Sequence, residues 1–85
     1  MTISETKDVI NEFKDDLREK YSLEWLEYTL NYSQEKRGFY KCDIYISKNG
    51  GIKSDYGYIS ENINKEILKK SIDLLVKCVA CGVRV

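Results

Sequence analysis

The feature that most constrains this chain is the change in its hydrophobic period, from helical to strand-like and back to helical. Near the amino terminus, apolar side chains recur at spacings of three, four and seven, which predicts one amphipathic helix. This stripe comprises Ile3, Ile10, Phe13, Leu17 and Tyr21. Thr2 and Glu5 have the spacing of a capping box, so we expect the helix to begin there.

The middle of the chain alternates apolar and polar residues, which predicts strands. Strands are expected at about 26–32, 39–47 and 52–59, with Tyr28, Tyr32 and Tyr40 facing the core. Asn49-Gly50 predicts a tight hairpin turn between the second and third strands. A second, more apolar helix then follows, with Ser60 or Asn62 as its N-cap and Gly82 as its C-cap.

Residues 1–85 are therefore expected to form a single small α+β domain. The predicted order is helix, three antiparallel strands, helix, with both helices on one face of the sheet. The other sheet face is left open to solvent or to a partner. Its expected side chains are Trp25, Glu27, Thr29, Asn31, Phe39, Lys41, Asp43, Tyr45, Lys53 and Asp55.

The residue types point away from catalysis, metals and cofactors. Histidine is absent, so Cys42 has no imidazole base to activate it, and Cys78 and Cys81 lack the second half of a zinc site. Cys78 and Cys81 fall at the end of the second helix, whereas a redox pair favours a helix start. We expect all three thiols to pack in the core, with an intermolecular disulfide or a dimer contact as the alternative for Cys78 and Cys81. The prediction is a protein that is not an enzyme, with no metal and no cofactor.

Fourteen basic and fourteen acidic residues cancel, so the total charge favours no nucleic-acid partner. The chain has no long apolar run and no basic stretch leading into an apolar one, so we expect neither a membrane span nor a signal peptide. An odd number of cysteines fits a reducing compartment. The abundance of Lys, Asn, Ile and Tyr is typical of low-GC bacterial or phage genes, which predicts the cytoplasm of a bacterial host cell.

The leading hypothesis is a non-enzymatic protein-binding module. Its partner would dock on the open sheet face, on the acidic face of the first helix, or on both. The candidate residues are Trp25, Phe39, Lys41, Asp43 and Tyr45 on the sheet, and Asp8, Glu12, Asp15, Asp16 and Glu19 on the helix. The bland interpretation of the sheet aromatics is cross-strand pairing, and a homodimer through the same face is compatible with either hypothesis.

The order of elements resembles two groups of small proteins. One is the double-stranded-RNA-binding domain, which implies a nucleic-acid surface built from Lys36, Arg37, Lys65, Lys69 and Lys70. Residues 33–38 lack the Gly-Pro-x-His element of that family, so this function is the alternative hypothesis. The other group is the small phage-encoded inhibitors, among them an anti-CRISPR type that blocks Cas9. That resemblance implies inhibition of a host protein by occupation of its surface.

Overall fold

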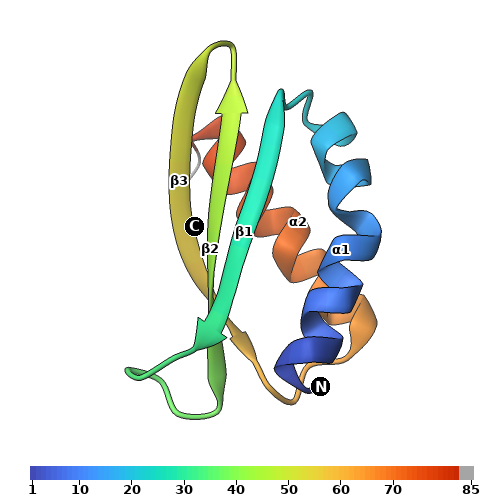
Figure 1. Cartoon of the computed structure of the whole chain (residues 1–85), viewed down its shortest axis with the longest axis vertical. Coiled ribbons are helices and arrows are strands. Elements are labelled where there is room, and N and C mark those ends of the chain that lie inside the picture. The colour runs from blue at the N-terminus through green and yellow to red at the C-terminus, as the bar shows by residue number, and fades with distance from the viewer. Residues whose placement is uncertain (83–85) are drawn as a thin grey trace.

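The computed structural model describes residues 1–82, which form a three-stranded antiparallel sheet and two helices. The elements are α1 (Ile3–Lys20), β1 (Trp25–Tyr32), β2 (Phe39–Lys48), β3 (Gly51–Ser60) and α2 (Lys65–Cys81). Both helices lie on one face of the sheet, and Figure 1 looks onto the other face, with α2 crossing behind the strands. The predicted α+β class and order of elements are confirmed.

Every strand pairs with its neighbour in sequence, so the sheet order is β1-β2-β3 and both outer strands have a free edge. The Asn49-Gly50 prediction is confirmed, because the two residues have φ values of 53° and 77°, as a tight hairpin turn requires. Glu24 Oε1 accepts a hydrogen bond from the Gly50 backbone N–H at 2.8 Å. That contact ties the turn to the residue just before β1.

The helix ends are set by side chains that satisfy free backbone N–H groups. Thr2 and Glu5 form the predicted capping box of α1, and Gly82 ends α2 in the left-handed conformation, also as predicted. The N-cap of α2 is Asn64, whose Oδ1 accepts from the Ile67 N–H at 2.9 Å. The prediction of Ser60 or Asn62 was wrong, since β3 runs through Ser60 and the Glu61 N–H still donates to the Gly38 carbonyl at 3.0 Å.

The core lies between the sheet and the two helices. Alternate residues of β2 are buried there, with Ile44 and Ile46 1% and 0% exposed. From α2, Leu68, Ile72 and Val76 meet them at 0–1% exposure. Burial of each such side chain stabilises the fold by about 1.5–3 kcal/mol.

The three tyrosines expected in the core differ in burial. Tyr40 is 2% exposed, and its hydroxyl donates to the Met1 carbonyl at 2.7 Å. Tyr28 is half-buried and donates to Asn11 Oδ1 at 2.8 Å. Tyr32 pairs with Tyr40 on the helix side of the sheet, as predicted, but it is 65% exposed and so lies outside the core. It lies at the end of β1 with its ring edge-on to that of Tyr40, at a centroid distance of 5.5 Å.

The faces of β3 are the reverse of the prediction. Lys53 lies opposite Ile46, and Asp55 lies opposite Ile44, so both point to the helix side of the sheet. The open face instead receives Ile52, Ser54, Tyr56 and Tyr58. The reason is the two-residue period of a strand, because buried Ile59 fixes every odd-numbered position of β3 on its own side.

Candidate functional site

The open sheet face presents several large side chains that neither α1 nor α2 covers. Near the β2–β3 turn, the register sets Ser47 between Trp25 and Ile52, which are 46% and 80% exposed. In the next row, Tyr45 lies between Glu27 and Ser54. Because the serine side chains are small, the surface between Trp25 and Ile52 lies lower than these two side chains. This apolar end of the open face is formed by Trp25, Tyr45, Ser47, Ile52 and Ser54.

The other end of the open face interleaves lysines with aromatic rings. Lys41 Nζ lies 4.5 Å from the centroid of the Tyr56 ring. Lys36 Nζ, from the β1–β2 turn, lies 5.1 Å from the Phe39 centroid and 4.9 Å from the Tyr58 centroid. These are cation–π distances, so the ammonium groups of Lys36 and Lys41 already lie over the Phe39, Tyr56 and Tyr58 rings.

Acidic side chains accompany these lysines. The Tyr58 hydroxyl donates to Glu35 Oε2 at 3.0 Å, and this hydrogen bond raises the pKa of Tyr58. Thr29 Oγ1 donates to Asp43 Oδ2 at 3.1 Å across the β1–β2 pair. The lysine-rich end is therefore close to charge balance, and its groups hold one another in place.

The strand residues predicted to bind a partner lie together on this face. The register places Phe39, Lys41, Asp43 and Tyr45 at alternate positions of β2, with Trp25 diagonal to Tyr45 on β1. Sequence reasoning did not place Lys36, Ile52, Tyr56 and Tyr58 on this face, and it assigned Lys36 only to the nucleic-acid alternative. Three of these could have been found, because a two-residue turn at Asn49-Gly50 pairs Lys48 with Gly51 and so places Ile52, Tyr56 and Tyr58 on the same face. Lys36 belongs to a turn whose path the sequence does not specify.

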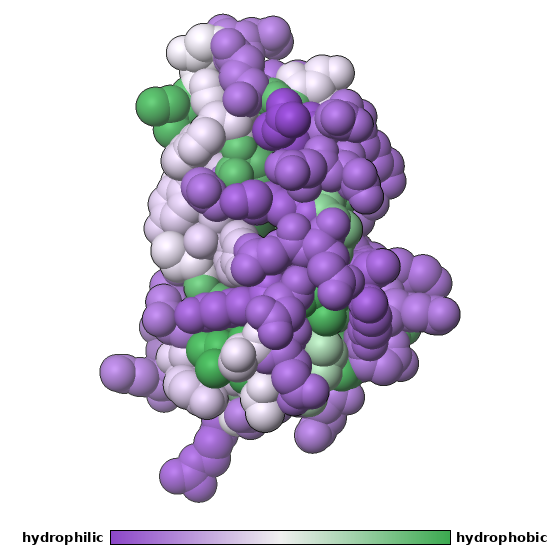
Figure 2. All heavy atoms as spheres, turned by 45° about the vertical axis from the view of Figure 1, so that its right-hand side comes forward, coloured by the Kyte–Doolittle hydropathy of each residue, from purple (hydrophilic) through white to green (hydrophobic). Residues whose placement is uncertain are grey.

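The acidic residues of α1 form a different surface. All are exposed, and Figure 2, which brings the α1 side of the molecule forward, is predominantly hydrophilic there. The helix packs on the face of the sheet opposite Trp25 and Tyr45, so these carboxylates do not join the open face. Glu12 is in an ion pair with Lys65 of α2 at 3.1 Å. The full set is Asp8, Glu12, Asp15, Asp16 and Glu19.

The basic residues of the nucleic-acid hypothesis are divided between the two layers. Lys36 and its neighbour Arg37 lie in the β1–β2 turn, where Lys36 extends over the open face. Lys65 and Lys69 point toward α1, where Lys65 pairs with Glu12 and Lys69 Nζ lies 5.8 Å from the Phe13 centroid. Lys70 is exposed on α2. The structure therefore does not bring these residues onto one surface.

The thiols have three different environments. Cys42 is fully buried, and desolvation raises its pKa to about 12, so it carries almost no thiolate at neutral pH. Cys78 is half-buried, but Cys81 is exposed. The prediction of core packing is thus confirmed for Cys42 and wrong for Cys81, which follows Val79 and Ala80, the last buried residues of α2. Within residues 1–82, no three side chains of the metal-ligating types come together.

An ionic cluster links the end of α1 to α2. Asp73 accepts hydrogen bonds from Lys20 Nζ, at 2.6 Å, and from the Tyr21 hydroxyl. Burial alone would raise the pKa of Asp73, but these two donors outweigh it and lower that pKa. Tyr21 has a raised pKa, first because it is desolvated and then because of Asp73. Each group has a partner, which is typical of a structural contact between helices.

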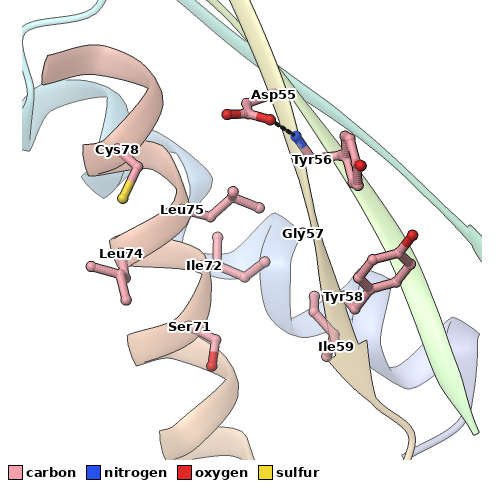
Figure 3. Close-up of a pocket in the computed structure, with 10 residues that line it drawn as sticks. All are labelled: Asp55, Tyr56, Gly57, Tyr58, Ile59, Ser71, Ile72, Leu74, Leu75 and Cys78. Atoms are coloured by element: carbon pink, nitrogen blue, oxygen red, sulfur yellow. Dashed lines mark hydrogen bonds between the residues drawn. The ribbon is translucent and has the colours of Figure 1, made fainter. Parts of the chain in front are cut away.

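A groove of about 410 Å³ lies between α2 and β3, beside the place where the two elements pack together. Figure 3 shows Ile72 and Leu75 pointing from α2 toward the strand, while Leu74 points away from it. Gly57 lets the helix approach, because a Cβ there would lie 3.4 Å from the Leu75 methyl carbons. Leu74 is 49% exposed beside this groove.

Comparison with protein-family models, curated proteins and solved structures returned no match. In the described part of the chain, no helix has the length and apolar character needed to cross a membrane.

Proposed function

We propose that this chain is a non-catalytic module that binds another protein through the open sheet face. The observation that carries the proposal is the apolar end of that face, where Trp25, Ile52 and Tyr45 surround two serines. Trp and Tyr are enriched at the centres of protein interfaces, and a large apolar side chain at 80% exposure, as for Ile52, gains most from being covered.

The partner is a protein surface with an apolar projection that fits between Trp25 and Ile52. The lysine-rich end would then meet polar or acidic groups at the rim, through Lys36 and Lys41. The absence of histidine and the raised pKa of Cys42 support a role in binding rather than in catalysis. The small size and the composition support a phage or mobile-element protein that inhibits or modulates a bacterial host protein in the cytoplasm.

A matched pair of variants tests this function. Trp25→Ala with Tyr45→Ala removes the apolar end, and Asp15→Ala with Asp16→Ala removes carboxylates from α1 without touching the sheet. Each tagged protein captures partners from bacterial lysates, with and without phage infection and with and without nuclease. Circular dichroism verifies that both variants remain folded.

We expect one protein to be retained by the wild type and by the α1 variant in nuclease-treated lysate. The sheet variant should weaken its affinity at least about 30-fold, as for the loss of an interface hot spot. Equal capture by the sheet variant would refute a role for this face. Loss by the α1 variant alone would transfer the function to the acidic helix.

Nucleic-acid binding is the second candidate, and the lysine–aromatic end of the open face is the observation that favours it. Bases stack on aromatic rings in grooves lined by cations. The ammonium groups of Lys36 and Lys41 occupy the faces of the Phe39, Tyr56 and Tyr58 rings, so a base would have to displace them. Capture that disappears with nuclease, and an affinity that falls steeply with salt, would select this candidate.

A further inference from the structure

Within residues 1–82, the free edge of β3 differs from the free edge of β1 in how little covers it. Residues 51–56 are exposed at every position, although they belong to a regular strand paired to β2. An uncovered edge presents unpaired N–H and C=O groups and is a template for another strand. The direction of the backbone groups and the side chains of this edge determine which strand can pair with it.

The direction of the backbone groups follows from one hydrogen bond. The Glu61 N–H donates to the Gly38 carbonyl, so odd-numbered residues on this side of the hairpin turn their backbone toward β2. Even-numbered residues therefore direct N–H and C=O to the free edge. Consistent with this, the Tyr56 N–H has no partner in β2 and donates instead to Asp55 Oδ1 at 2.8 Å (Figure 3).

We propose that this edge pairs with β3 of a second copy of the chain, antiparallel about a two-fold axis at Ser54. In that register Ile52 lies opposite Tyr56 of the second copy, and Ser54 lies opposite itself. All of these are even-numbered, outward-directed residues, so their backbone groups can exchange hydrogen bonds in full. The result is one continuous sheet through both copies.

The charges of the edge select this register. About Ser54, Lys53 stands opposite Asp55 of the second copy, and the same pair recurs on the other side of the axis. An axis moved one residue, to Lys53 or to Asp55, would place like charges opposite each other, which destabilises a strand pair. Lys53 and Asp55 therefore oppose pairing with strands that lack the complementary order of charges, and a second copy running in the opposite direction supplies that order.

The side chains next to the axis also fit. On the open face, exposed Ile52 would pack on Tyr56 of the second copy, a β-branched–aromatic pair. On the helix side, Gly57 would lie opposite Gly51, so neither member of that pair has a side chain to obstruct the pairing. Asp55 would exchange its hydrogen bond to the Tyr56 N–H for the ion pair with Lys53 of the second copy.

A pairing of this size is expected to be concentration-dependent, since an edge contact is small for a stable interface. Sedimentation equilibrium from about 1 µM to about 1 mM gives the dissociation constant. Each single reversal, Lys53→Asp or Asp55→Lys, converts both ion pairs into like-charge pairs, and we expect it to raise that constant at least tenfold. The double variant carrying both changes restores opposite charges and should return to within about threefold of the wild type.

A second variant tests the backbone. Ser54→Pro removes an outward N–H that β2 does not use, so an edge strand tolerates it while the pairing is lost. Trp25→Ala is the control for dimerisation through the open face and should leave the constant unchanged.

Three results would overturn the proposal. They are a monomer over the whole concentration range, a dimer indifferent to the charge reversals and to proline, or a double variant that is not rescued. A failure of this proposal is distinguishable from a failure of the protein-binding function, because that function is read from capture of another protein and is tested by the Trp25→Ala with Tyr45→Ala variant, which leaves β3 unchanged.

Discussion

Replacing Tyr40 by phenylalanine removes one oxygen atom from the contact that holds the start of the chain to the sheet. The Tyr40 hydroxyl is the donor to the Met1 carbonyl at 2.7 Å, and its ring is 2% exposed. Without the hydroxyl, the carbonyl is left in a partly buried place where water replaces the donor poorly. A net loss of about 1 kcal/mol is expected, within the range of about 0.5–1.5 kcal/mol for such bonds.

For a domain of this size, about 1 kcal/mol lowers Tm by about 4–8 °C. Thermal and urea unfolding followed by circular dichroism measure the change. Tyr32→Phe is the matched control, because its ring lies edge-on to the Tyr40 ring but is 65% exposed. Its hydroxyl is already in water, so the expected change is below about 0.5 kcal/mol. Equal effects of the two substitutions would show that the Met1 contact contributes nothing, and the reasoning would fail.

Three further predictions concern thiols, pH and the hairpin turn. With a thiol reagent at pH 8, Cys81 should react at once, whereas Cys42 should react only after unfolding. The reason is that raising the pKa of Cys42 from 9.0 to about 12 lowers its thiolate population about a thousandfold. Rapid labelling of Cys42 in the native protein would contradict its burial. Because the pKa of Asp73 is lowered in the folded state, its carboxylate stabilises the fold at pH values above the ordinary pKa of 3.8, and this contribution is lost as the pH falls through the folded pKa. The urea midpoint of Asp73→Asn, measured against pH, should therefore lack this part of the acid dependence. A profile identical to that of the wild type would disprove the contribution. Gly50→Ala should lower the free energy of unfolding by about 1 kcal/mol, because φ is 77° there. Gly51→Ala, at a position without positive φ, should lower it less. Equal losses in denaturant unfolding would exclude turn strain as the cause.

The sequence was most informative where one local rule acts without competition. The stripe from Ile3 to Leu17 allows only one buried helix face, and Asn49-Gly50 has few alternatives to a tight turn. The start of α2 could not be predicted in this way. Ser60, Asn62 and Asn64 are all good N-caps. The tertiary hydrogen bond from Glu61 to Gly38 excludes Ser60, and the turn closed by the Ile63 N–H on the Ser60 carbonyl contains Asn62, so the helix begins after Asn64.

The candidate site was predictable on β1 and β2 but not on β3. Phe39 to Ser47 alternates cleanly, so its open-face residues follow from the period alone. In β3, apolar and aromatic residues occur at both parities, as Tyr58 beside Ile59 illustrates, and only the hairpin register separates them. The position of Lys36 over two rings depends on the shape of a turn, which period and composition do not contain.

The neighbour-to-neighbour order of the strands also has a consequence for how the chain folds. Both strand pairs close over short turns, and hairpins of this kind form in about 1–10 µs. The contact between α1 and α2 joins the two ends of the described chain and closes its longest loop, so it carries the largest entropy cost. Substitutions in the hairpins should therefore change the folding rate, whereas loss of the ion pair between Lys20 and Asp73 should mainly speed unfolding.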